Sequence, residues 1–126
     1  MTDLNFSVQK EFNFTFTKKN IDDLMVTALE GGINYWAIKA IKHKEPNEDL
    51  ENVRTASDYI SRGGELIIVT DEGEKLPLNY ENFVKGLKMA IKNSGSDNSK
   101  DFMDNHDADI ADQIIQYALF DEIVFC

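Results

Sequence analysis

Residues that cross-link or break a chain are scarce in this sequence. It contains one cysteine and two prolines among 126 residues, and the cysteine, Cys126, is the last residue. A single cysteine cannot form a disulfide within the chain, which favours a reducing, cytoplasmic setting. No apolar run approaches the length that crosses a bilayer. The first residues also lack the basic and apolar stretches of a secretory signal peptide. We therefore expect a cytoplasmic protein with no membrane partner.

Positive charge is scarce as well. The chain has 13 lysines and arginines against 23 aspartates and glutamates, a formal net charge of -10. This balance argues against direct binding to nucleic acid or to an anionic membrane. The segment from Asp97 to Cys126 holds eight acids and one base and so carries -7 of that charge, whereas lysines cluster at residues 39–44 and 85–92. We expect an electrically bipolar molecule, although a merely solvated surface is the commoner reason for such charge.

Length and hydrophobic periodicity predict a single α+β domain over residues 1–126. We expect a mixed or antiparallel sheet of about four to five strands, packed mainly on one side by three to four helices, and a mobile connector around residues 94–106. Expected strands cover residues 6–16 (one strand or a strand pair), 33–41, 65–70 and 75–78. Expected helices cover residues 20–30, 55–62, 80–93 and 107–120.

Two glycine positions bear on the interpretation of these elements. Gly31–Gly32 is expected to end a helix that Asn20 begins as N-cap. Because the chain there passes from helix into strand, it does not form the strand-to-helix glycine loop that holds phosphates. Gly86 lies inside an expected helix at a cost of about 1 kcal/mol relative to alanine, and we expect a neighbouring backbone to approach it closely.

The candidate partner-binding residues lie on two elements. Tyr35 and Trp36 are consecutive, so on a strand they would point to opposite faces, one buried and the other free to anchor an interface. Both could equally be covered by flanking helices. Four polar residues share one face of the last helix by their i, i+3, i+4 and i+7 spacing, and they form the most coherent candidate surface: Asp109, Asp112, Gln113 and Gln116.

Three stretches of the sequence carry a resemblance. They are residues 28–36 (ALEGGINYW), 57–64 (SDYISRGG) and 111–120 (ADQIIQYALF). In these the chain resembles a family of small uncharacterised proteins from phages and conjugative elements of gut Firmicutes. The resemblance implies an accessory protein of a mobile element, and it brings no catalytic residues with it.

An enzymatic function has weak support in the sequence. Residues 104–109 place three carboxylates and His106 close together, which suits a divalent cation, but capping of the last helix explains the acids more simply. Glu30 stands at a helix C-terminus, where a carboxylate is poorly placed unless it has a site or an ion pair with Arg54 or Arg62. We assign no catalytic residue, metal or cofactor.

Three functions stay open at this point. We favour a non-enzymatic protein-interaction module of a mobile genetic element, an anti-defence or regulatory factor that acts on a protein partner through its acidic surface. In one version the acidic C-terminal third imitates nucleic-acid phosphates. The alternatives are a small metal-dependent enzyme and a homo-oligomeric structural protein, the latter recognisable as a stable dimer.

Overall fold

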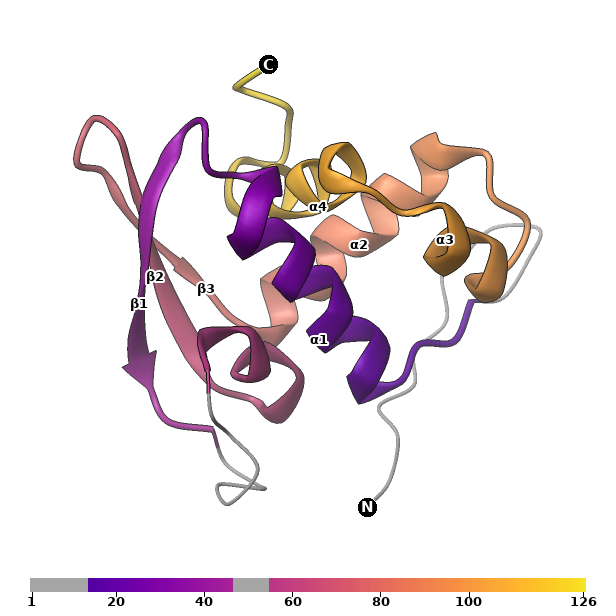
Figure 1. Cartoon of the computed structure of the whole chain (residues 1–126), viewed down its shortest axis with the longest axis horizontal. Helices are drawn as coiled ribbons and strands as arrows, with labels where there is room; N and C mark the ends of the chain where they lie inside the picture. Colours follow the sequence, from indigo (N-terminus) through magenta and orange to yellow (C-terminus); the bar gives the residue numbers. More distant parts are fainter. Residues whose placement is uncertain (1–13, 47–54) are drawn as a thin grey trace.

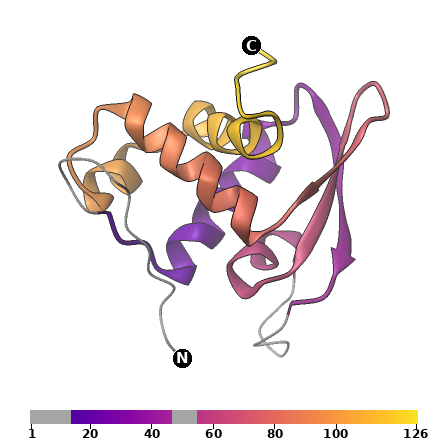
Figure 2. The same ribbon diagram turned by 180° about the vertical axis from the view of Figure 1, so that it is seen from behind.

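A computed structural model describes residues 14–46 and 55–126, and over these residues the chain is an α+β domain. Its elements are α1 (Lys18–Thr27), the π-helical turn η1 (Ala28–Gly32), β1 (Ala37–Lys44), the 3-10 turns η3 (Ala56–Asp58) and η4 (Ile60–Arg62), β2 (Glu65–Thr70), β3 (Lys75–Leu78), α2 (Tyr80–Ser94), α3 (Ser99–Asn105) and α4 (Ala108–Phe120). The sheet stands at one side of the helices, and α3 lies at the opposite end (Figure 1). The view from behind shows α2 between β3 and α3 (Figure 2).

The sheet of the described residues has three antiparallel strands in the order β1-β2-β3, fewer than the four to five expected. Most of the strand or strand pair expected at residues 6–16 lies outside the described residues. Phe14 and Phe16 are described, and they are not in a strand; both are buried, and Phe16 packs edge-on against Phe102 of α3. Phe14 stacks on Phe16, with ring centroids 6.4 Å apart, so the two described phenylalanines are core residues outside the sheet.

The first helix differs from its prediction at its start. Thr17 is its N-cap, while Asn20 is the third helical residue and completes a capping box: Asn20 N donates to Thr17 Oγ1 (3.1 Å) and Thr17 N donates to Asn20 Oδ1 (3.0 Å). At the other end the α-helix stops at Thr27 and continues as η1, whose last residue is Gly32, so the helical segment ends at the predicted glycines. A further turn follows, so β1 begins at Ala37 and not at residue 33.

The helix pair α2 and α4 is predicted well, and it forms the rigid centre of the domain. The two helices pack so closely that a Cβ at Gly86 would lie 2.7 Å from Ala118 N and would also collide with Ile114 O. The close backbone approach expected at Gly86 is therefore confirmed. The segment expected to be a connector contains α3, which is held to the core by Phe102; mobility there stays a prediction.

The described helices are all too short or too polar to cross a bilayer. Their apolar faces instead join one side of the sheet in a single core. Register places Ala40, Ile68 and Leu76 side by side across the three strands, with Ile68 fully buried beneath the helices. The next row, which contains Ile41 and Ile67, points to the other face of the sheet.

Candidate interaction surface

A buried carboxylate, Asp112 of α4, lies at the centre of the candidate site. Trp36 Nε1 donates to its Oδ1 (2.8 Å), Gln116 Nε2 donates to the same oxygen (3.0 Å), and the Tyr35 hydroxyl donates to Oδ2 (2.5 Å). Asp112 is 8% exposed, and Trp36 and Gln116 are fully or almost fully buried. A buried carboxylate without partners is costly, so these donors account for its place in the core.

Local geometry explains why the turn after η1 reaches Asp112. Gly32 packs against the start of α4, where a Cβ would lie 2.8 Å from Ala108 O and 3.3 Å from Asp112 N. The absent side chain lets η1 approach the α4 backbone. The chain then turns through Ile33 and Asn34, with Trp36 N and Ala37 N both donating to Ile33 O, before β1 starts. This turn delivers the Tyr35 and Trp36 side chains together to one carboxylate.

Gln116 fixes the C-terminal tail, residues 121–126, against α4. Its Oε1 accepts from Val124 N (2.7 Å) and Phe125 N (2.8 Å), and its Nε2 donates to Phe125 O (3.0 Å). One side-chain amide therefore satisfies three backbone groups of a segment that belongs to no helix or strand. The tail is visible beyond the end of α4 in Figure 1.

Aromatic stacking is a second contact that holds the tail against the fold. The Phe125 ring lies parallel to the Trp36 indole, with centroids 5.0 Å apart and an interplanar angle of 6°, and it meets Phe120 edge-on at 5.8 Å. Asp121, with φ of 63°, makes the left-handed turn that directs the chain back, and its carboxylate pairs with Lys85 at 2.6 Å. The end of the tail thus packs on Trp36 and α4.

The residues of this assembly around its open side are called the tail surface; they include buried as well as exposed side chains. The tail surface surrounds a hollow of about 400 Å³. Its members are Tyr35, Asp109, Asp112, Gln113, Gln116, Ile123, Phe125 and Cys126, which line the hollow, and the neighbouring Val124. Tyr35, Ile123 and Val124 are 52%, 40% and 50% exposed. The tail surface therefore offers aromatic and aliphatic area beside the exposed carboxylate of Asp109.

The pKa of the Tyr35 hydroxyl is raised in this setting. Although half of the residue is exposed, its hydroxyl is turned toward Asp112. Burial, then the hydrogen bond to Asp112 and its negative charge, raises the pKa of Tyr35 to about 12 from 10.0. The proton on Tyr35 is thus part of the network, because losing it would place two negative charges side by side.

The structure brings the six predicted partner-binding residues to one place but gives them different positions. Asp112 and Gln116, predicted to be exposed, are buried and engaged within the fold. Tyr35 and Trp36 are in a turn, so they converge on Asp112 and do not point to opposite faces; Trp36 is the buried one. Asp109 and Gln113 lie at the hollow, Asp109 exposed and Gln113 half-buried.

Sequence reasoning missed the contribution of the tail backbone. The four-residue spacing of Asp112 and Gln116 was the available signal, since it puts an acceptor and an amide on one helix face. The partners of that amide, Val124 and Phe125, have no sequence feature that would identify them.

Of the residues considered for chemistry, Asp109 lines this hollow, whereas His106, Glu30 and Arg62 do not. His106 Nδ1 is 2.6 Å from Met103 O and its Nε2 is 3.3 Å from Thr27 Oγ1, so the ring links the end of α3 to α1. Glu30 is exposed on η1, and Arg62 pairs with Asp22 at 3.0 Å; Arg54 lies outside the described residues. Over residues 14–46 and 55–126, no three His, Cys, Asp or Glu side chains are grouped so that they could hold a metal ion.

Comparisons with protein-family models, with curated proteins and with solved structures found no match for this chain. The site must therefore be interpreted from its own geometry.

Proposed function

We propose that the protein is a non-enzymatic protein-interaction module that binds a basic partner protein through the tail surface. The observation that carries the proposal is the exposure of Tyr35, Ile123 and Val124 on a frame fixed by hydrogen bonds, two of which are buried at Asp112. Binding costs less when the contact residues are already ordered, and aromatic anchors in a fixed setting dominate interface energies.

The charge of the region favours a basic partner. Asp109 is exposed beside the hollow, and Asp104, Asp107 and Glu122 are exposed nearby in the sequence, in a chain of net charge -10. An acidic rim steers a basic partner toward the apolar centre and makes the association salt-sensitive.

The resemblance to proteins of phages and conjugative elements suggests the source of the partner. In this proposal the partner is a host protein, and the module acts as an anti-defence or regulatory factor. In its sharper form the exposed acids occupy the nucleic-acid site of a host DNA-binding protein, as phosphates would. The acids at the end of α3 and the start of α4 supply negative charge for such mimicry.

Tagged protein incubated with a Firmicutes lysate at low and high salt tests the proposal, with mass spectrometry of the retained proteins. We expect a dominant partner that is lost at high salt. Asp109→Lys and Val124→Asp should each reduce its retention about tenfold or more, because one reverses the rim charge and the other places a charge in the apolar area.

A matched control distinguishes an effect of the tail surface from an effect of net charge. Glu72→Lys makes the same charge change as Asp109→Lys at an exposed position in the turn between β2 and β3, and it should leave retention within about twofold. If Glu72→Lys lowered partner retention as much as Asp109→Lys, net charge alone would explain the loss. That result would contradict the proposal. A stable dimer with no retained partner would favour the homo-oligomeric alternative.

A further inference from the structure

The edge of the sheet offers a second site, distinct from the tail surface. In the described part of the chain β1 hydrogen-bonds only to β2, so one side of β1 is a sheet edge. Six of its eight residues are exposed. A strand edge presents unpaired backbone N–H and C=O groups, and an added extended chain can pair with them.

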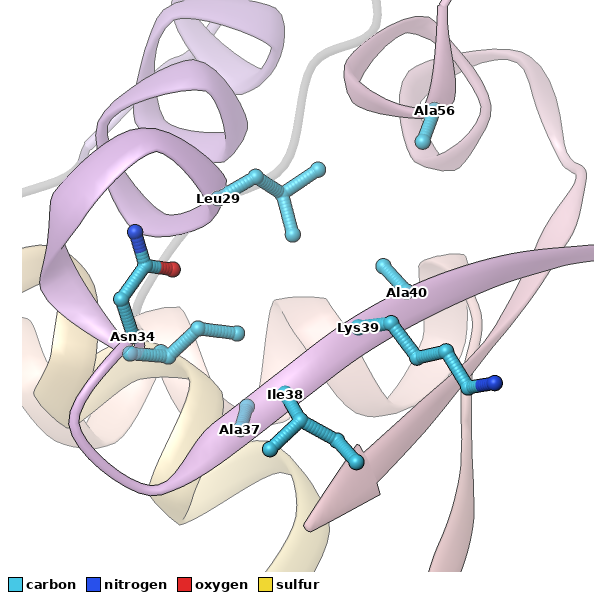
Figure 3. A pocket seen from close by; sticks show the side chains of 8 residues that line it. Leu29, Asn34, Ala37, Ile38, Lys39, Ala40 and Ala56 are labelled. Atoms are coloured by element: carbon cyan, nitrogen blue, oxygen red, sulfur yellow. The ribbon is translucent and has the colours of Figure 1, made fainter. Parts of the chain in front are cut away.

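A groove runs beside this edge on the helix side of the sheet. It has a volume of about 550 Å³, and its apolar lining includes Leu29, Ile33, Ala37, Ala40 and Ala56. Leu29 from η1 and Ala40 from β1 project toward the same open space, with Ala56 on the far side (Figure 3). The small side chains at Ala40 and Ala56 leave room for side chains of an added strand.

The sheet register dictates what such a strand must carry. Ala40 pairs with the buried Ile68, so the position of an added strand opposite Ala40 faces the groove and favours an apolar side chain. Lys39 pairs with Val69 on the other face, so the adjacent position faces Lys39 and favours an acid. The regular pairing between two bulges, from residue 39 to residue 42, sets the length of the site.

Charge decides between a foreign strand and a second copy of the chain. Lys39, Lys42 and Lys44 are all exposed on β1. Pairing β1 with β1 of another copy would bring these lysines together, and like charges on neighbouring strands are destabilising. An acid of a foreign strand gains from Lys39, which lies on the face opposite to Ala40. Lys42 lies over the Tyr59 ring, and Lys44 Nζ is 3.9 Å from Glu65 Oε2, so Lys39 is the lysine that selects the acid.

We infer that the edge of β1 and its groove bind an extended segment of a partner protein, with alternating apolar and acidic residues, as a fourth strand of the sheet. Apolar side chains of that segment enter the groove beside Ala40 and Ala56, and its acids lie along Lys39. The inference is independent of the tail surface, because the two sites share no lining residue.

Fluorescence anisotropy on the full chain tests this inference, with a fluorescein-labelled peptide that alternates valine and aspartate as the probe. Two N-methylated versions of the peptide keep every side chain and remove backbone donors from alternate residues, one set in each version. Strand addition uses only the set of donors that faces β1. We expect one version to bind at least about tenfold more weakly and the other to bind like the parent.

Variants of the protein locate the site. Lys39→Glu should weaken binding about three- to tenfold and Ala56→Leu by a similar factor, since one reverses the facing charge and the other fills the groove. Val124→Asp, on the tail surface, should leave binding unchanged. No saturable binding, equal effects of the two methylation patterns, or binding unaffected by both Lys39→Glu and Ala56→Leu would each overturn the inference. A concentration-dependent dimer that Ala56→Leu dissociates would put a second copy in the groove and overturn it too.

Discussion

The α4 side and the β1 edge of this small domain are built in opposite ways. On the α4 side, glycines at two contacts allow close backbone packing, and a buried carboxylate joins the turn at Tyr35 and Trp36 to the helix. At the β1 edge the strand is exposed, rich in lysine and bordered by an open groove. The contrast teaches that the two sides differ in both packing and charge. The acidic α4 side is closely packed, whereas the basic β1 edge is accessible.

This comparison predicts that mutations on the α4 side cost stability and that mutations on the β1 edge do not. The largest effect is expected for Asp112→Ala, which leaves the buried Trp36 N–H without its acceptor and removes one of the acceptors of Gln116 Nε2. The loss should be about 3–5 kcal/mol of unfolding free energy, measured by urea denaturation. Asp112→Asn, which keeps one acceptor oxygen, should lose less. If Asp112→Ala lost under about 1 kcal/mol, the network would not hold this side together.

Gly86→Ala is expected to have the next largest effect. The new Cβ would meet the backbone of α4 at Ile114 and Ala118, and the resulting overpacking outweighs the better helix propensity of alanine. We expect a net loss of about 1–3 kcal/mol in unfolding free energy. Gly31→Ala is the matched control, since nothing lies within 4 Å of the added atom, and it should be neutral or slightly stabilising. Equal effects at both glycines would contradict the close packing of α2 and α4.

Much of this side could be predicted from sequence because its signals are local. The apolar stripes of α2 and α4 placed both helices to within about one residue, and the glycine inside α2 signalled the close contact. The spacing of the polar residues on α4 also predicted that they share one face. The burial of this face could not be predicted, because it depends on Tyr35 and Trp36, more than seventy residues earlier, and on the tail backbone.

The sequence was least informative where local rules compete. A capping box makes Thr17 and Asn20 equally good candidates for the helix start, since each side chain bonds the backbone of the other. Gly31 and Gly32 close the π-helical turn η1, and of the two only Gly32 packs against α4. At Gly32 a tertiary contact selects among conformations that the local sequence permits.

Tyr35 should make the stability of the α4 side depend on pH. Its pKa is raised to about 12 in the folded protein, so the folded state binds the proton more tightly than the unfolded chain does. Its contribution is fully present below the ordinary value of 10.0 and is lost as the pH rises toward about 12. Tyr35→Phe should cost about 1 kcal/mol at neutral pH, because the site is half exposed, and this difference should shrink at high pH. A pH-independent difference in urea denaturation would contradict this account.

The smallest effect is expected at the β1 edge. Ile38 is 63% exposed, so Ile38→Thr removes little buried area and retains a β-branched side chain. Its unfolding free energy should stay within about 0.5 kcal/mol of the parent, measured by the same denaturation. A loss above about 1 kcal/mol would show that this edge is packed, and the contrast between the two sides would fail.

The central claim is that the tail surface is preformed, with its backbone held by Gln116 before any partner binds. Hydrogen exchange of the free protein, resolved at individual amides by NMR, tests it most directly. The account predicts slow exchange at Val124 N and Phe125 N, both of which donate to Gln116 Oε1, and fast exchange there in Gln116→Met. Exchange at the rate of an unstructured peptide in the parent protein would contradict it.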